Sequence, residues 1–230
     1  YSLLITSVSY NQYDISELFL DMGADINMQN PRGETPLYIV CREYDKSIDL
    51  LLLLLNRGAK INEVIRFGGT TALEGAINHG TLETVKLLLE YGADPNLGDQ
   101  HNNRPLQNAA TENTDMVKIL LEYGADINGT NDKGYTALLF ACITNNYDII
   151  DMLLEYGIDP FILNDENEHI FTTNMLKEDV KEIVEKKLYE LHKLNVSYDM
   201  VEIAKGIQED HLDELTDDVL EVIYDYLISM

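Results

Sequence analysis

Tryptophan is absent from this chain of 230 residues, and cysteine is rare, with two copies. Cys41 and Cys142 form no Cys-x-x-Cys pair and are too few for a disulfide framework, which favours a reducing compartment, the cytoplasm or the nucleus. The longest apolar run, Leu50 to Leu55, falls far short of the roughly 20 residues of a membrane span. No signal peptide is visible, although a chain that begins at Tyr1 is expected to have lost its N-terminal end.

Basic residues are also scarce. Sixteen lysines and arginines face 41 acidic residues, which gives a net charge of −25 and a pI near 4.3. Nucleic-acid affinity comes mostly from Lys and Arg side chains that neutralise phosphates, and no basic cluster stands out here. The composition therefore argues against nucleic acids and anionic membranes as partners. We expect instead a protein partner with a basic patch, attracted over the roughly 10 Å that salt leaves unscreened.

The sequence carries no convincing reactive centre. The five histidines are scattered, and the carboxylates around His211 lack the i, i+4 spacing of metal ligands on one helix. Residues 159–168 are acidic but lack the spacing of a calcium loop. There is no glycine-rich phosphate loop, no Gly-x-Ser-x-Gly and no Cys–His nucleophile pattern. We therefore predict no catalytic, metal-binding or cofactor-binding residues, and we do not expect an enzyme.

The chain does contain a repeat. Five segments share one pattern: LDMGADIN (20–27), LNRGAKIN (55–62), LEYGADPN (89–96), LEYGADIN (121–128) and LEYGIDPF (154–161). Their glycines are 35, 34, 32 and 33 residues apart. A second block precedes the later copies: GETPLYIV (33–40), GTTALEGA (69–76), NRPLQNAA (103–110) and GYTALLFA (134–141). Self-similarity at a fixed period of this length is typical of stacked repeat units.

The period and the two blocks resemble those of ankyrin repeats over residues 1–160. The resemblance implies an all-α solenoid in which each repeat has two antiparallel helices and a β-hairpin loop. We expect five repeats over 1–160, a degenerate repeat and capping helix over 161–195, and a C-terminal helical segment over 196–230. The family's usual histidine after Thr-Pro-Leu is replaced, which predicts less firmly braced hairpins; the replacements are Tyr38, Glu74, Gln107 and Leu139.

Individual residues at the predicted helix ends and in the predicted core also agree with a repeat of two helices. Apolar spacing predicts a helix that ends before Gly92, where glycine accepts the left-handed conformation of a C-cap. Its apolar face is expected to contain Leu82, Val85, Leu87, Leu88 and Leu89. Thr35, Thr71 and Thr136 stand where a helix begins, and their hydroxyls are predicted to cap it. Cys41 and Cys142 occupy the same repeat position, which favours small buried packing residues over a redox or metal role.

Ankyrin proteins bind partners with their hairpin tips and the concave side of their first helices, so the resemblance implies partner-binding residues here. At the tips they are Arg32, Ile65, Arg66, Phe67, His101 and Lys133; on the helices they are Tyr38, Arg42, Glu74, Asn78, Gln107, Thr111, Leu139 and Ile143. An exposed Ile65 and Phe67 around Arg66 is typical of an interface hot spot, unless these side chains fold back onto the next repeat. Tyr38 and Arg42, one helical turn apart, are the second most favoured candidates for contact with a partner.

Beyond residue 160 the repeat pattern fades. Residues 164–171 resemble a last, degenerate hairpin. Helical spacing with interleaved charges then runs from Leu176 to Leu191, and this is typical of the polar-faced terminal unit that a repeat stack needs.

The segment LTDDVLEVIYDYL (215–227) resembles the start of an F-box, although Thr216 replaces the usual proline. The matching residues are Leu215, Asp218, Val219, Leu220, Ile223, Tyr226 and Leu227. Some ankyrin proteins of viral and bacterial pathogens resemble this arrangement. Their tail binds the Skp-type adaptor of a cullin–RING ubiquitin ligase, and their repeats select the substrate. The alternative is that this amphipathic helix only closes the solenoid.

Three functions therefore stay open for a protein-interaction module: substrate receptor of a ubiquitin ligase, passive scaffold or sequestering protein, and targeting arm of an enzyme outside this chain. We expect a monomer, because five repeats and a cap can bury a core unaided. Abundant Asn, Asp, Ile and Tyr suggest an AT-rich genome, as in many pathogens, and then the cytoplasm would be that of a host cell.

Overall fold

Two compact units make up the chain in the computed structural model, which describes residues 3–43, 48–66 and 68–193. Of the described residues, the first unit contains 3–109 and 115–126, and the second contains 110–114 and 127–193. The predicted segment 196–230, with its F-box-like residues, lies outside the described residues. Every regular element in the described part is a helix, in agreement with the predicted all-α fold class.

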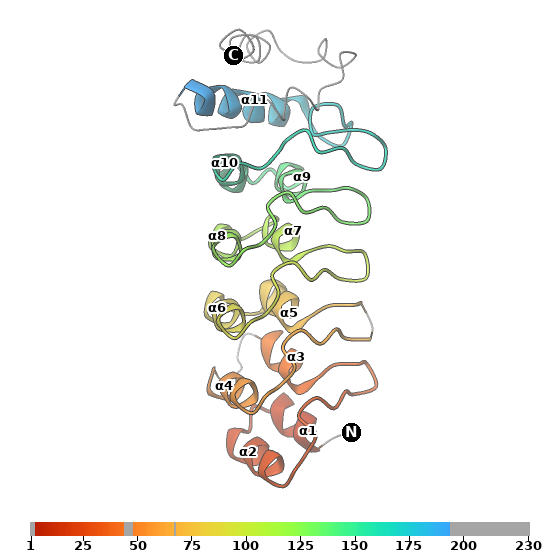
Figure 1. Ribbon diagram of the computed structural model, residues 1–230, viewed down its shortest axis with the longest axis vertical. Helices are drawn as coiled ribbons and strands as arrows, with labels where there is room; N and C mark the ends of the chain where they lie inside the picture. The colour runs from red at the N-terminus through yellow and green to blue at the C-terminus, as the bar shows by residue number, and fades with distance from the viewer. Residues whose placement is uncertain (1–2, 44–47, 67, 194–230) are drawn as a thin grey trace. The chain divides into compact units, whose positions relative to one another are not determined.

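Helices come in pairs (Figure 1). In the first unit they are α1 (Leu3–Ser9) with α2 (Tyr13–Asp21), α3 (Pro36–Cys41) with α4 (Ile48–Asn56), α5 (Ala72–His79) with α6 (Leu82–Glu90), and α7 (Pro105–Ala109) with α8 (Thr114–Glu122). The second unit holds α9 (Ala137–Ile143), α10 (Tyr147–Glu155) and α11 (Glu178–Lys193). Within the first unit the odd-numbered helices pack on one another, the even-numbered helices lie beside them, and the loops leave on the opposite side (Figure 1).

The core of each unit follows the apolar spacing of the sequence. Val85, Leu88 and Leu89 of α6 are buried as predicted, but the prediction for Leu82 is wrong, because its side chain is 39% exposed. Leu82 is the first residue of α6, where few neighbours cover a side chain. Tyr147 starts α10 in the same way and is 43% exposed.

The predicted helix ends are confirmed. The hydroxyl oxygens of Thr35, Thr71 and Thr136 accept hydrogen bonds from backbone N–H groups in the first turns of α3, α5 and α9. Gly92 follows α6 with φ +92°, the left-handed conformation that glycine adopts without strain. Both cysteine thiols are buried, as expected from their shared repeat position. Burial raises their pKa values, that of Cys142 to about 12, so neither is poised as a thiolate.

Four of the five hairpin loops close on an Asn or Asp seven residues after the repeat glycine. In the fourth loop, Asn131 Oδ1 accepts bonds from the backbone N–H groups of Lys133 and Tyr135 at 3.0 and 2.9 Å. Asn30, Asp99 and Asn164 accept the corresponding pairs of bonds in their own loops. A carboxylate or amide oxygen that holds two backbone donors fixes the turn locally. The second loop is the exception and is described with the site below.

An asparagine four residues after the repeat glycine joins one repeat to the next. Asn62 Oδ1 accepts a bond from the Asp94 backbone N–H at 2.9 Å, and its amide group donates to the Gly92 carbonyl at 3.3 Å. Asn27, Asn96 and Asn128 accept equivalent bonds from Lys60, Asp126 and Asp159 at 2.7–2.8 Å. The Gly-Ala-Asp-x-Asn block of the sequence is therefore the connection between successive repeats.

The second unit ends this pattern with aromatic packing. Phe161 stands where the earlier repeats have the linking asparagine, and its ring meets those of His169 and Phe171 at centroid distances of 5.3 and 5.4 Å. Helix α11 then packs on α10, with Val180 and Val184 buried, and the helix predicted between residues 176 and 191 is thus present. Lys187 Nζ secures it from the polar side, 2.8 Å from Glu155 Oε1.

Candidate functional site

The exposed ends of the hairpin loops carry most of the predicted tip residues. Arg32, Arg66 and His101 are exposed on the first three loops, and Lys133 is exposed in the second unit. Phe67 lies outside the described residues.

Ile65 is a correction, because its side chain is only 6% exposed and is not available to a partner. It stands seven residues after Gly58, the position that Asn or Asp fills in the other loops, and this position points inward: Asn131 and Asn164 are also buried. Without a side-chain oxygen there, the second loop relies on the backbone bond that all five loops make from this position, here from Ile65 N–H to the Thr70 carbonyl at 2.9 Å. This loop is also one residue longer, since Gly58 and Gly69 are eleven positions apart and Gly23 and Gly33 are ten.

Three of the predicted helix positions are also corrections, because Glu74, Gln107 and Leu139 are buried. Each is the third residue of a short helix or of its first turn, so its side chain lies against the helix start. Glu74 Oε2 accepts a bond from the Thr71 backbone N–H at 3.0 Å, and Gln107 Oε1 accepts one from Arg104 N–H at 2.6 Å. The Thr-x-x-Glu spacing of a capping box was visible at 71–74 and could have been used to predict this. These bonds brace the helix start where the family has its histidine.

The carboxyl group of Glu74 has an unusual environment. Burial raises its pKa from 4.5 to about 8, the bond from Thr71 opposes this shift, and the charge of Asp99 adds to it. The group is therefore mostly protonated at neutral pH, which lessens the cost of burying it. Asn108 Nδ2 lies 3.5 Å from Glu74 Oε1. A carboxyl group sealed in this way supports the fold rather than contacts a partner.

Tyr38 and Arg42 are half-buried and largely engaged with neighbours. Arg42 lies 5.9 Å from the centroid of the Tyr38 ring, and its guanidinium is 2.5 Å from Glu34 Oε1. Glu34 is buried and also accepts a bond from Asn30 Nδ2 at 2.6 Å. The pair thus ties α3 to the first loop and presents only part of its surface to a partner.

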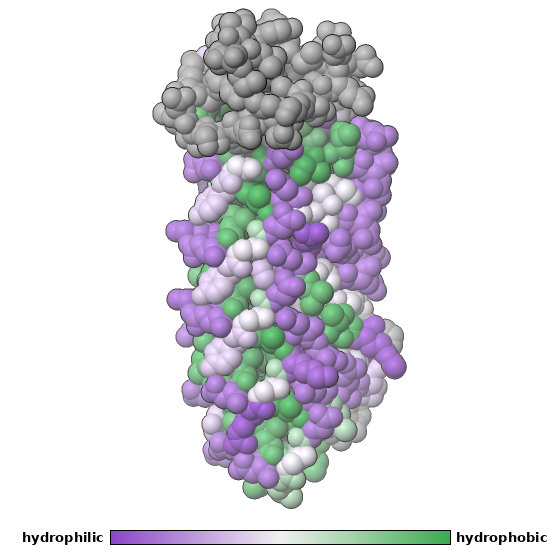
Figure 2. Space-filling model, in the orientation of Figure 1, coloured by the Kyte–Doolittle hydropathy of each residue, from purple (hydrophilic) through white to green (hydrophobic). Residues whose placement is uncertain are grey.

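The remaining helix positions are more open. Asn78 near the end of α5 and Ile143 at the end of α9 are exposed, while Thr111 is half-buried. In the first unit the structure therefore leaves one set of predicted residues exposed, and we call it the loop-side surface: Arg32, Arg66, Asn78 and His101. Figure 2 shows that the edge formed by the hairpin loops is mostly hydrophilic.

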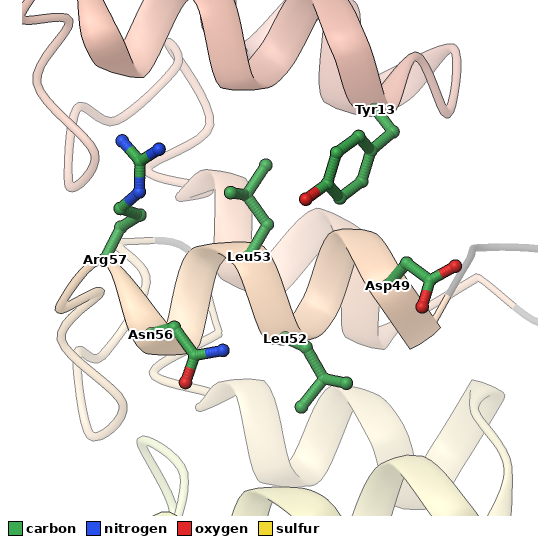
Figure 3. A pocket seen from close by; sticks show the side chains of 6 residues that line it. All are labelled: Tyr13, Asp49, Leu52, Leu53, Asn56 and Arg57. Atoms are coloured by element: carbon green, nitrogen blue, oxygen red, sulfur yellow. The ribbon is translucent and has the colours of Figure 1, made fainter.

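A pocket between α2 and α4 was missed by sequence reasoning (Figure 3). Its volume is about 550 Å³, and it is lined by Tyr13, Asp49, Leu52, Leu53, Asn56 and Arg57. Tyr13 reaches from α2 towards α4, and Leu53 and Arg57 point back towards α2, while Leu52 and Asn56 point away on the other side. Arg57 closes one end, 2.8 Å from Asp21 on α2, and this carboxylate raises the pKa of the guanidinium. Leu52, within the apolar run 50–55, is half-exposed here.

Chemical sites are not evident in the described part of the chain. No group of three or more His, Cys, Asp or Glu side chains there is arranged to hold a metal ion. None of the helices described is both long and apolar enough to cross a membrane.

Paired helices, braced loops and asparagines that link one repeat to the next define a helical repeat protein. A family model described as ankyrin repeats (3 copies) matches residues 4–99 and 95–164, well over half of the chain. The chain belongs to the ankyrin-repeat family, as its repeat pattern indicated.

Known relatives share the repeats over part of their length. The chain is 40% identical over 97 residues to the transient receptor potential channel pyrexia of Drosophila melanogaster. This match covers 42% of this chain and 10% of that protein. It is 36% identical over 117 residues to an ankyrin repeat protein of fowlpox virus, and the match covers 50% of this chain and 34% of that protein. It is 35% identical over 100 residues to ankyrin repeat and SOCS box protein 6 of Pongo abelii, and that match covers 41% of this chain and 24% of the relative. The chain thus spans about a third or less of each relative.

Proposed function

We propose that this chain is a protein-binding module that holds its partner on the loop-side surface. The observation that carries the proposal is that Arg32, Arg66 and His101 are exposed on loops whose backbones are held by local bonds. Side chains on a backbone that is already ordered bind with a smaller entropy cost than those on a mobile loop. Membership of the ankyrin-repeat family supports the same class of function.

Photo-crosslinking from single positions tests this proposal. A benzophenone side chain would replace Asn78 on α5 in one variant and Lys118, exposed on α8, in a matched control. We expect protein adducts from a cell extract at position 78 and few at position 118. Adducts at position 118 alone would place the binding surface on the even-numbered helices and contradict the proposal.

A basic patch on the partner, outside the part held by the loop-side surface, would be drawn to the even-numbered helices. Glu83 and Glu90 on α6 and Asp115 and Glu122 on α8 are exposed carboxylates. Fields of this kind act mainly on the rate of association and weaken with salt. A basic surface on the partner would therefore speed its approach to this side.

A second candidate function is substrate receptor of a cullin–RING ubiquitin ligase. It is carried by the F-box-like residues between 215 and 227, and the name of one relative joins ankyrin repeats with a SOCS box in one protein. A pull-down against the Skp-type adaptor tests it, with the double variant Ile223→Asp and Leu227→Asp. Binding by the wild type that a folded variant loses would support this function. Failure of the wild type would leave the passive scaffold, or the targeting arm of an enzyme, as the remaining functions.

A cytoplasmic location and a monomeric state complete the proposal. Two buried free thiols suit a reducing compartment, the nucleus included. Sedimentation that detects a stable dimer would contradict the monomer.

A further inference from the structure

The charge on the hairpin tips is opposite to that of the chain as a whole. At a net charge of −25, the exposed tips of the first unit nevertheless carry Arg32, Arg66 and His101. These tips form one row, because their loops touch. A Cβ atom added to Gly33 would overlap the backbone N of Arg66, and Gln100 N–H donates to the Gly68 carbonyl at 3.3 Å. We call Arg32, Arg66 and His101 the tip row.

The arginines of the tip row differ from the others nearby. Arg42 is paired with Glu34, and Arg104 lies 2.9 Å from Asp126. Among the described residues, no ion pair engages the guanidinium group of Arg32 or that of Arg66.

The carboxylates near the tip row are already engaged. Asp99 Oδ1 accepts bonds from the His101 and Asn103 backbone N–H groups at 2.8 and 2.9 Å. Glu63 lies 3.8 Å from Lys60 Nζ, and Glu34 is held by Arg42. The tip row therefore keeps two guanidinium groups without an ion-pair partner among the described residues, while the ring of His101 lies 3.2 Å from Gln100 Nε2.

The many carboxylates elsewhere do not cancel this charge. Those of α6 and α8 lie on the far side of the odd-numbered helices from the loops (Figure 1). A helix with its side chains is about 10–12 Å wide, whereas salt at physiological strength screens exposed charges beyond about 8 Å. A ligand at the tips is governed by the nearby arginines.

We propose that the tip row binds an extended, acidic segment of the partner protein. The inference rests on the proposed protein-binding function. Stacked helices recur at about 8–10 Å. A segment in the polyproline II conformation returns to the same face every three residues, about 9 Å further on, so Asp or Glu at every third residue would match the row. Guanidinium groups are suited to this, because their fork of N–H donors fits a carboxylate. Nucleic acid is disfavoured, because two arginines would neutralise few phosphates.

A display library of random 16-residue peptides, selected on the whole chain in about 0.1 M salt, tests the inference. We expect selected peptides to be enriched in Asp and Glu. Their affinity should fall about fivefold or more in the double variant Arg32→Ala and Arg66→Ala, and less than about twofold in the control Lys86→Ala and Lys118→Ala, which removes equal charge from α6 and α8. Circular dichroism verifies that both variants fold.

Each other outcome overturns the inference. One such outcome is that the selected peptides are not enriched in acidic residues, bind the Asn78→Arg variant of the chain weakly, and bind the tip-row variant normally. The proposed function would then stand, and this inference would be wrong. If neither variant changed the affinity of the selected peptides, both the proposed binding at the loop-side surface and this inference would be wrong. A 12-nucleotide oligothymidine that competes with the selected peptides would assign the row to phosphates instead of carboxylates.

Discussion

The second and fourth hairpin loops, residues 63–71 and 129–136, differ in where they bury a polar side chain. Two positions are compared: the inward position of the loop and the third residue of the helix that follows. In the second loop the inward position holds Ile65, and the buried position at the helix start holds Glu74. In the fourth loop the inward position holds Asn131, and the helix start holds Leu139. At these two positions, each loop together with the helix that follows it thus buries one polar and one apolar side chain. The comparison teaches that either position can hold the polar residue, whose oxygen then accepts bonds from backbone N–H groups.

The largest effect is expected from the glycine that makes the longer second loop possible. Gly69 has φ +67°, and a Cβ atom there would lie 2.5 Å from the backbone N of Gln100. Gly69→Ala should therefore lower the free energy of unfolding by about 3 kcal/mol, measured by urea denaturation. The neighbouring Gly68→Ala is the control, because its nearest atom is 3.9 Å away, and it should cost about 1 kcal/mol. Equal losses would show that backbone conformation, and not contact between loops, decides.

Replacing Ile65 of the second loop by asparagine, the residue at the same position of the fourth loop, tests whether the two loops can exchange this residue. Ile65→Asn should destabilise the chain by about 2–3 kcal/mol, because the amide would enter an apolar site in a loop one residue too long to bond it. Ile65→Val, which keeps the apolar character, should cost about 1 kcal/mol. Thermal unfolding of both variants measures this, and a stable Ile65→Asn would mean that the loop can adopt the geometry of the fourth.

Removing the oxygen from the fourth loop gives the reverse test. Asn131→Ala leaves two backbone N–H groups without their acceptor and should cost about 2 kcal/mol. Asn131→Asp keeps that oxygen, as Asp99 does in the third loop, and should cost less than about 1 kcal/mol. If guanidinium denaturation gave equal losses for both, the amide nitrogen and not the oxygen would be the important group.

The last effect is expected from Glu74, the buried acid on α5 of the third helix pair, and it depends on pH. The Glu74 pKa is raised from 4.5 to about 8 in the folded chain, so folding favours the protonated group. Its contribution is complete below about pH 4.5 and is lost as the pH rises towards 8. Relative to Glu74→Gln, the wild type should therefore lose about 2–3 kcal/mol of stability between pH 5 and 8. The exposed Glu83→Gln should show no such trend, and a flat difference for Glu74→Gln would refute the shift.

Much of the fold and part of the candidate site could be predicted from local pattern. The caps at Thr35, Thr71 and Thr136 were predictable because capping is settled within one helical turn. The exposed tip residues Arg32, Arg66 and His101 followed from their place in each repeat. Ile65 was misjudged because its neighbours along the chain do not show that the loop position points inward. The pocket between α2 and α4 was missed because it needs side chains from two repeats.

What the sequence by itself determined is the repeat: its period, its helix ends and the family that these define. Such features depend on interactions within a few residues of one another, and they recur in register along the chain. The tertiary structure alone decided which side chains remain available to a partner. Burial of Glu74 and contact between the tips of the first three loops arise between repeats, where residues some 30 positions apart meet. The positive row on an acidic protein is therefore a property of the stacked loops and is not visible in net charge.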